Sequence, residues 1–260
     1  MEIVKNVHEN KFQSLFGGLG GDELNAGEYE YFFFRFADLK YSGQNDLLEI
    51  EIAKWQEHHD HPIFKKNRQI ALKTMDEVCD FDVKGLCLVD NQRKNKYAYL
   101  LNKDRMSIEN YKPNLYSFSD SYLNNRTWQD IFYETAPCCI RAENRQSSYY
   151  GLDNFLPFYD DRLVKFMINL DGKYKIKNGV TKYLLRKAMT GILPKKTNDR
   201  IKKTGWNAPS HIWFSQDSYD DIKDMLNSSK FINRGIYNID KVQLILDEHV
   251  EIVSNNLKKE

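Results

Sequence analysis

The chain has 260 residues, of which 41% are hydrophobic and 13% aromatic, a composition that excludes an intrinsically disordered protein. Its 38 basic and 37 acidic side chains leave a formal charge of +1, so there is no global positive field to attract nucleic acid. We find no run of 18 apolar residues and no apolar N-terminal segment, so we expect neither a membrane span nor a signal peptide. The four cysteines, Cys79, Cys87, Cys138 and Cys139, lack metal-binding spacing and indicate reduced thiols in a cytoplasmic protein.

The first half of the chain is predicted to be mostly helical. A glycine-rich stretch at 15–27 leads into an aromatic segment, 23–39, that is typical of a largely buried helix. Two further helices are predicted at 45–60, ended by His61-Pro62, and at 65–78. Residues 83–102 set two apolar runs around a polar turn, a pattern that predicts a β-hairpin.

The second half begins with a loop-like segment, 105–122, and then returns to helix. The predicted helices are 127–136, 160–170, 181–189, 219–229 and 238–259. We expect Pro137 to stop the first of them, and Asp171-Gly172 to close the second. Thr181 is a candidate N-cap for the third. The chain is therefore predicted to be mainly α, with the hairpin as an excursion from a helical body and no firm domain boundary.

The stretch L-F-G-G-L-G-G-D-E-L-N-A-G, residues 15–27, holds five of the 13 glycines. Successive glycines let backbone N–H groups point into one concavity and form an anion site, where Asp22 can hold Mg²⁺ against phosphate oxygens. The alternative is a tight turn in which Asp22 and Glu23 cap the following helix. These physical arguments leave both interpretations open.

Three other clusters contain candidate functional residues. Residues 198–213 contain Arg200, Lys202 and Lys203, which either neutralise polyphosphate charge or form a solvated basic loop. The acids Asp153, Asp160 and Asp161 are either acid–base groups or helix-start residues. The tract with His58, His59 and His61 is a metal site or a solvated helix end, and the second is favoured because no partner with ligand spacing is evident.

Read in order, four segments resemble the synthetase domain of glutamine-dependent asparagine synthetases. G-G-L-G-G-D-E-L-N-A-G resembles S-G-E-G-x-D-E-L-F-G-G, and residues 141–166 are similar to R-x-E-D-R-x-S-M-x-x-G-x-E-x-R-x-P-F-L-D-x-x-L-V-x-F. Residues 179–196 resemble G-x-x-K-x-x-L-R-x-A-x-x-x-x-L-P, and 202–214 resemble K-x-G-F-x-x-P-x-x-W-F. The resemblance implies the C-terminal portion of an α/β adenine-nucleotide-hydrolase-like (PP-loop) domain, with a motif-bearing core at 15–214 and C-terminal helices at 215–260.

The same resemblance implies a chemistry in which ATP adenylates a carboxylate and ammonia then forms an amide. Asp22 takes the place of the aspartate that binds the Mg²⁺–pyrophosphate, and Lys203 matches the lysine that stabilises transition-state charge. Asp153 stands at the glutamate position of G-x-E and is a second catalytic candidate. We expect the nucleotide to be held by Gly18, Gly20, Gly21, Lys182 and Arg186. The implied substrate is aspartate or a related acid.

The chain also departs from the family pattern. Leu19 replaces the glutamate of S-G-E-G and cannot transfer a proton, and the E-D pair is Glu143-Asn144. The nucleotide loop S-G-G-x-D-S and the glutaminase domain are not found in this sequence. We therefore expect part of a split or longer ligase that needs an upstream polypeptide, with a non-catalytic remnant as the alternative and a standalone enzyme of altered chemistry least favoured.

Overall fold

The computed structural model describes residues 2–60, 65–106, 108, 114–202, 209–216 and 218–257, without the side chains of 256 and 257. These residues divide into two compact units. Unit 1 comprises Met1–Leu88 and Leu115–Lys203, and unit 2 comprises Val89–Asn114 and Thr204–Glu260. The described residues are mainly helical, which confirms the predicted class, whereas the PP-loop topology stays a prediction.

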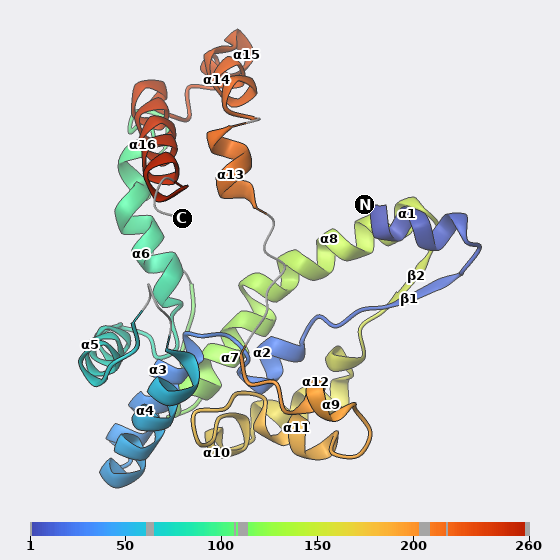
Figure 1. Cartoon of the computed structure of the whole chain (residues 1–260), viewed down its shortest axis with the longest axis vertical. Coiled ribbons are helices and arrows are strands. Elements are labelled where there is room, and N and C mark those ends of the chain that lie inside the picture. Colours follow the sequence, from blue (N-terminus) through green and yellow to red (C-terminus); the bar gives the residue numbers. More distant parts are fainter. Residues whose placement is uncertain are drawn as a thin grey trace. The chain divides into compact units, whose positions relative to one another are not determined.

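Unit 1 is built from helices and one short sheet, which lies beside α8 (Figure 1). Its helices are α1 (Glu2–Glu9), α2 (Gly21–Asn25), α3 (Tyr31–Tyr41), α4 (Asn45–His59), α5 (Arg68–Cys79), α7 (Tyr122–Phe132), α8 (Thr135–Tyr149), η2 (Pro157–Tyr159), α9 (Asp161–Ile168), α10 (Gly172–Lys175), α11 (Tyr183–Ala188) and α12 (Lys195–Asn198). Strands β1 (Ser14–Phe16) and β2 (Asp153–Phe155) run parallel, with Ser14 opposite Asp153. Because they are far apart in sequence, this pairing brings the glycine stretch beside the segment that contains Asp153.

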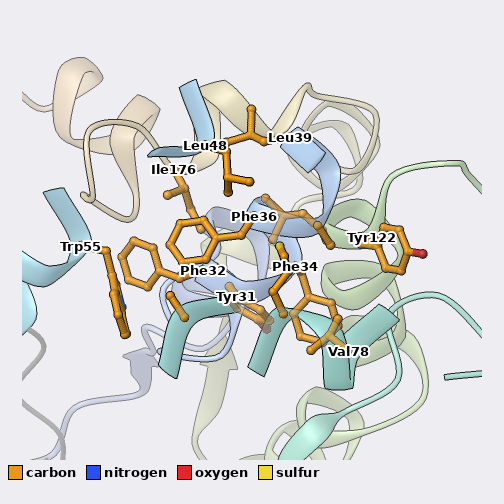
Figure 2. Packing of buried hydrophobic residues seen from close by; sticks show 14 of the residues in the cluster. Tyr31, Phe32, Phe34, Phe36, Leu39, Leu48, Trp55, Val78, Tyr122 and Ile176 are labelled. Carbon is orange, nitrogen blue, oxygen red and sulfur yellow. The ribbon is translucent and has the colours of Figure 1, made fainter. Parts of the chain in front are cut away.

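The core of unit 1 is centred on α3, which is buried over most of its circumference (Figure 2). Phe32, Phe34 and Phe36 are fully buried, and the helix packs against α4, α5 and α7. The indole of Trp55 lies edge-on to Phe36, with ring centroids 6.1 Å apart. Burial of one such aromatic ring contributes about 1.5–3 kcal/mol, so the aromatic run from position 31 explains why this helix is the centre of the fold.

A buried ionic network joins α3, α7 and α8. The guanidinium of Arg126 pairs with Glu30 at 3.6 Å, with Asp130 at 4.0 Å and with Glu134, and its Nη1 donates to the carbonyl of Gly85 at 2.8 Å. Burial alone would lower the pKa of Arg126, but the charges of Glu134 and Glu30 outweigh it and raise that pKa. Removal of one member of such a network leaves an uncompensated buried charge.

Unit 2 consists of α6 (Leu88–Tyr97, whose first residue is assigned to unit 1), η1 (Ala98–Leu100), α13 (Ser210–Ser215), α14 (Tyr219–Asn227), α15 (Ser229–Ile232) and α16 (Ile239–Leu257). The ring of His249 donates through Nε2 to the carbonyl of His211 at 2.8 Å, and the hydroxyl of Tyr219 donates to Asp247 at 2.6 Å. An antiparallel bridge joins Leu101 to Tyr237. These contacts tie α16 to α13, α14 and the segment after α6.

The predicted hairpin at 83–102 is wrong, because its centre forms α6 and its end forms η1. The supposed turn, residues 90–96, contains no glycine and is rich in Gln, Arg and Lys, which have good helix propensity. Asp90 and Arg93 also pair at 3.9 Å across one turn of this helix. Straight-chain polar residues between two apolar runs therefore formed a helix and not a reversal.

Several helix boundaries also differ from the prediction. The helix predicted at 127–136 is α7, at Tyr122–Phe132, and Asp171 caps the start of α10 where it was expected to close the preceding helix. The single helix expected at 23–39 is two helices, because Ala26 adopts a left-handed conformation (φ 52°) that ends α2. Pro137 does not stop a helix but lies in the first turn of α8, where its missing N–H costs no intrahelical bond. The helices predicted at 45–60, 65–78, 160–170, 219–229 and 238–259 are confirmed within a few residues.

In the part of the chain that the structure describes, no helix has both the length and the apolar character needed to cross a bilayer.

Candidate functional site

The glycine loop before α2 is shaped by close packing against η2. Gly20 has a φ of 90°, and a side chain there would approach Cβ of Phe158 to 2.9 Å and the ring of Tyr159 to 3.0 Å. The amide of Gly21 donates to the carbonyl of Gly18 at 3.2 Å, which closes the turn. A Cβ added at Gly18, by contrast, would meet no described atom within 4 Å, so the outer side of this residue is open. The loop thus combines a tightly packed inner side with an accessible outer side.

Asp22 and Lys182 form the central contact of the site. The Lys182 Nζ lies 2.6 Å from Oδ1 of Asp22, and both side chains are 30% exposed. Gly27 lies directly behind the pair, since a Cβ there would come within 2.0 Å of Asp22 Oδ1 and 2.6 Å of Lys182 Cε. An aspartate and a glycine of the segment 15–27 therefore meet a lysine from a distant part of the sequence.

Lys182 is held by a turn that is anchored on α4. The carboxylate of Glu51, which is 1% exposed, accepts the amides of Asn178 and Gly179 at 2.7 Å each. The buried ring of His59 donates through Nε2 to the carbonyl of Gly179 at 2.9 Å. Lys182 then adopts a left-handed conformation, with φ 57°, and its amide donates to the carbonyl of Asn25 in α2. These contacts fix the lysine opposite Asp22.

Next to Asp22 in the chain is the buried carboxyl group of Glu23. Burial raises the pKa of Glu23, and the neighbouring charges of Asp130 and Asp22 raise it further. Asp130 accepts a hydrogen bond from the buried hydroxyl of Tyr31, whose pKa is raised by burial and by Asp130 itself. Buried acidic groups therefore lie close to the more exposed carboxylate of Asp22.

Arg186 binds backbone carbonyl groups on three sides. Its Nε donates to Thr181 at 2.8 Å, and its Nη1 donates to Asn198 at 2.8 Å and to Arg200 at 2.7 Å. Burial, followed by the charge of Arg200, lowers the pKa of this guanidinium. The arrangement fixes the start of the segment that leads to Lys203, which lies outside the described residues. Arg186 thus links α11, whose N-cap is Lys182, to the segment that follows α12 and leads to Lys203.

Asp153 is exposed on β2, and no interaction joining it to Asp22 or Lys182 is found among the described residues. At the next position, the amide of Asn154 donates to Glu143 at 3.3 Å and to Asn144 at 3.1 Å. Phe155 occupies the arginine position of the family pattern and stacks on Phe16, with ring centroids 5.1 Å apart. The strand therefore carries an aromatic pair where the pattern places a cation.

Among the predicted site residues, the structure brings Lys182 to Asp22, which directly follows Gly20 and Gly21 in the chain. Gly18 closes the same loop by accepting from the amide of Gly21. Sequence reasoning missed Gly27 and Glu51, although the final glycine of the family pattern marks the first of them. Thr181 is not the N-cap of α11, because Lys182 occupies that position without a side-chain cap. His59 is a buried core residue bonded to Gly179, which supports a structural role; His61 lies outside the described residues.

Comparison with known proteins identifies the class. The family model described as asparagine synthase matches residues 2–260, and the chain belongs to that family. It is similar to the asparagine synthetase [glutamine-hydrolyzing] 1 of Bacillus subtilis (strain 168), at 26% identity over 166 residues. That match covers 58% of this chain and 25% of the relative. No solved structure gives a significant match.

Proposed function

We propose that this chain supplies the pyrophosphate-binding side of an ATP-dependent, amide-forming ligase. The observation that carries the proposal is the 2.6 Å pair of Asp22 and Lys182, set beside the glycine loop of a chain from the asparagine synthase family. The carboxylate is suited to a magnesium ion and the ammonium to phosphate oxygens. A Cβ at Gly18 would meet no described atom within 4 Å, so this part of the loop leaves room for a polyphosphate.

The donor set fits Mg²⁺, since Asp22 offers hard carboxylate oxygens and its side chain is 30% exposed. Asp22 would hold the ion, which would offset the negative charge of the released pyrophosphate. Lys182 now neutralises Asp22, and in the loaded site its Nζ is free to turn to a phosphate oxygen. Arg186 positions the segment that carries Lys203, and Lys203 stabilises charge in the transition state.

The remaining parts of the reaction are also proposals. The substrate is a carboxylate, aspartate or a related acid, which ATP activates by adenylation before ammonia attacks. Asp153 is assigned a supporting acid–base role. The nucleotide loop and the glutaminase domain come from a polypeptide segment outside these 260 residues. The sheet has two strands in the described region, so its edges are suited to pairing with further strands, and the exposed rings of Phe16 and Phe155 are suited to packing against such a segment.

A non-catalytic remnant is the second candidate, and Leu19 is the observation that favours it. A leucine cannot replace a proton-transferring glutamate, so one step of the family chemistry lacks its group in this loop. In that case the Asp22–Lys182 pair would persist only as a structural contact.

Binding of magnesium pyrophosphate, measured by isothermal titration calorimetry, tests the proposal directly on the chain. We expect 1:1 binding that is weakened at least about tenfold by Asp22→Asn, because a charge-assisted contact is worth about 1.5–3 kcal/mol. Asp161→Asn is the matched control, since Asp161 is exposed and pairs only with Lys165 among described residues. Equal binding by both variants would contradict the assignment of Asp22.

The proposed ligase activity requires a second polypeptide that carries the nucleotide loop S-G-G-x-D-S. The chain alone is expected to show no ATP–pyrophosphate exchange with aspartate, whereas co-expression with a polypeptide containing S-G-G-x-D-S should produce exchange. Asp22→Ala and Lys203→Ala should abolish that exchange. Exchange that survives both substitutions would remove the site assignment, and magnesium pyrophosphate binding without any exchange would favour the remnant.

A further inference from the structure

A second pocket in unit 1 lies apart from the residues used so far. It has a volume of about 750 Å³ and is bounded by α3, the start of α4, the N-terminal end of α7 and the segment 169–173. Neither Asp22 nor Lys182 lines it. Polar and charged side chains dominate its wall, whereas Tyr41 and Leu47 provide a smaller apolar part. The pocket is therefore large enough for a small metabolite and is chemically distinct from the glycine loop.

Arg35 is the unexplained group in this wall. Its side chain is only 7% exposed, and its Nε is buried without a hydrogen-bond partner among the described residues. The closest carboxylate, on Asp171, lies 4.0 Å from Nη1. A Cβ at position 172 would lie 3.3 Å from Nη1, so Gly172 leaves the space that the guanidinium occupies. The charges of Asp171 and Asp38 offset part of the charge of Arg35, but its buried Nε still lacks an acceptor among the described residues, and an anionic group from outside could supply one.

The neighbouring carboxylates of Asp38 and Asp171 already accept hydrogen bonds from backbone amides. Asp38 accepts from the hydroxyl of Ser121 at 2.7 Å and from the amide of Tyr122 at 2.6 Å. Asp171 accepts from the amide of Lys173 at 2.9 Å and caps α10. Both carboxylates therefore hold helix N-termini in place, and neither forms a close bidentate ion pair with Arg35.

The charge balance of the pocket restricts the ligand. The lining includes three cationic side chains, on Arg35, Lys84 and Lys173, and three carboxylates, on Asp38, Asp120 and Asp171. The wall has no excess of positive charge, so a dianionic phosphate would be repelled by the three carboxylates. A zwitterion matches this wall, because its carboxylate can pair with the buried guanidinium while its ammonium shares the exposed carboxylates of Asp120 and Asp171. These two carboxylates also pair with Lys84 at 3.7 Å and with Lys173 at 3.6 Å.

We propose that this pocket binds a free α-amino acid, with the ligand carboxylate on Arg35 and the ligand ammonium toward Asp120 and Asp171. The volume exceeds that of the amino-acid backbone, so the side chain of the ligand lies along Tyr41 and Leu47. This site goes beyond the proposed function and does not depend on it, because it shares no residue with the Asp22–Lys182 pair.

The test is a titration of the chain with each of the 20 amino acids, and with acetate, methylamine and inorganic phosphate as separate probes. We expect at least one amino acid to bind 1:1, and at least tenfold more tightly than any of the three simple ions. If no amino acid binds at millimolar concentration, or if acetate or phosphate binds as tightly, the proposal is overturned.

Two variants locate the site. Arg35→Met should weaken amino-acid binding at least tenfold. Asp171→Asn should weaken amino-acid binding without weakening acetate binding, because it removes a negative charge 4.0 Å from the guanidinium. Asn is also a good N-cap, so the second variant keeps α10 and remains informative if Arg35→Met fails to fold. Arg68→Met is the control, since Arg68 is exposed and pairs with Glu49 outside the pocket. Binding unaffected in Asp171→Asn would overturn the proposal.

Discussion

At the scale of single residues, the site depends on one position that has no side chain. Gly27 does not need a left-handed backbone; it is required because Asp22 and Lys182 occupy the space where a Cβ would stand. The same reasoning separates it from Gly18, where an added Cβ would meet no described atom. A glycine count alone does not reveal this difference, because both residues belong to the same motif.

Gly27→Ala should therefore lower the free energy of unfolding by about 1–3 kcal/mol, the usual cost of overpacking. The added methyl group must displace the carboxylate of Asp22 or the stem of Lys182. Urea unfolding gives the measurement, and Gly18→Ala, expected to change stability by less than about 0.5 kcal/mol, is the control. If both variants lose the same stability, crowding behind the ion pair is not the cause.

The buried side chain of Lys175 leads us to predict how the stability of the protein depends on pH. Burial lowers the pKa of this lysine to about 7, and its Nζ donates to Asn124 at 2.9 Å and to Thr127 at 3.2 Å. Its pKa in the unfolded chain is higher, so between about pH 7 and about pH 10 the unfolded state binds more protons and stability rises with pH. Below that range both states are protonated, and this contribution becomes constant.

Lys175→Met should remove that rise, which has a slope of at most about 1.4 kcal/mol per pH unit. Unfolding by urea at several pH values measures it, and Lys173→Met serves as the control because Lys173 is exposed. The attribution to Lys175 fails if its replacement leaves the slope unchanged.

At the scale of elements, α4 acts on the site through a turn that is more than a hundred residues further along the chain. Glu51 accepts both amides of the turn at 178–179, and the chain reaches Lys182 three residues later. An element whose periodicity indicates only a core helix is therefore also the support for the charged pair.

Glu51→Gln should cost about 1–3 kcal/mol of stability, because an amide side chain has one acceptor oxygen for two buried N–H groups. It should also weaken pyrophosphate binding by displacing Lys182, although Glu51 does not contact that lysine. Glu49→Gln, on the same helix, is the control, since Glu49 is exposed and forms a surface pair with Arg68. Unchanged pyrophosphate affinity in Glu51→Gln would argue against the positioning role.

Some elements were predictable from the sequence and others were not, for physical reasons. Helices such as α9 and α16 follow from their apolar periodicity, and α9 also from its capping aspartate, Asp160. The break after α2 depends on Ala26 in a left-handed conformation, which alanine rarely adopts and which no composition signals. The Asp22–Lys182 pair depends on tertiary folding, so motifs suggested both residues but could not show that they meet.

At the scale of the whole molecule, the chain divides into two units with separate internal contacts. The two described clusters of buried apolar residues, one centred on α3 and one on Leu24, both belong to unit 1. Unit 2 relies on α16 and its neighbours, and contains a single described tryptophan, Trp213. The two units are therefore expected to differ in stability.

We expect urea unfolding to proceed in two steps, since units with separate internal contacts need not unfold together. Glu51→Gln should shift the step reported by unit 1, whereas the step reported by unit 2 should keep its midpoint. Hydrogen exchange with mass spectrometry resolves the two, using peptides from α3 and from α16. A single transition that shifts as a whole in the variant would show that the units unfold cooperatively.

The left-handed backbone of Lys182 has a consequence for the evolution and engineering of this protein. An L-residue in that conformation costs about 1 kcal/mol relative to glycine, so selection for stability alone would replace the lysine. Its ammonium, however, is the group that faces Asp22. Position 182 is thus a point of conflict between thermostability and ligand affinity, and a library screened only for heat resistance would lose the site there first.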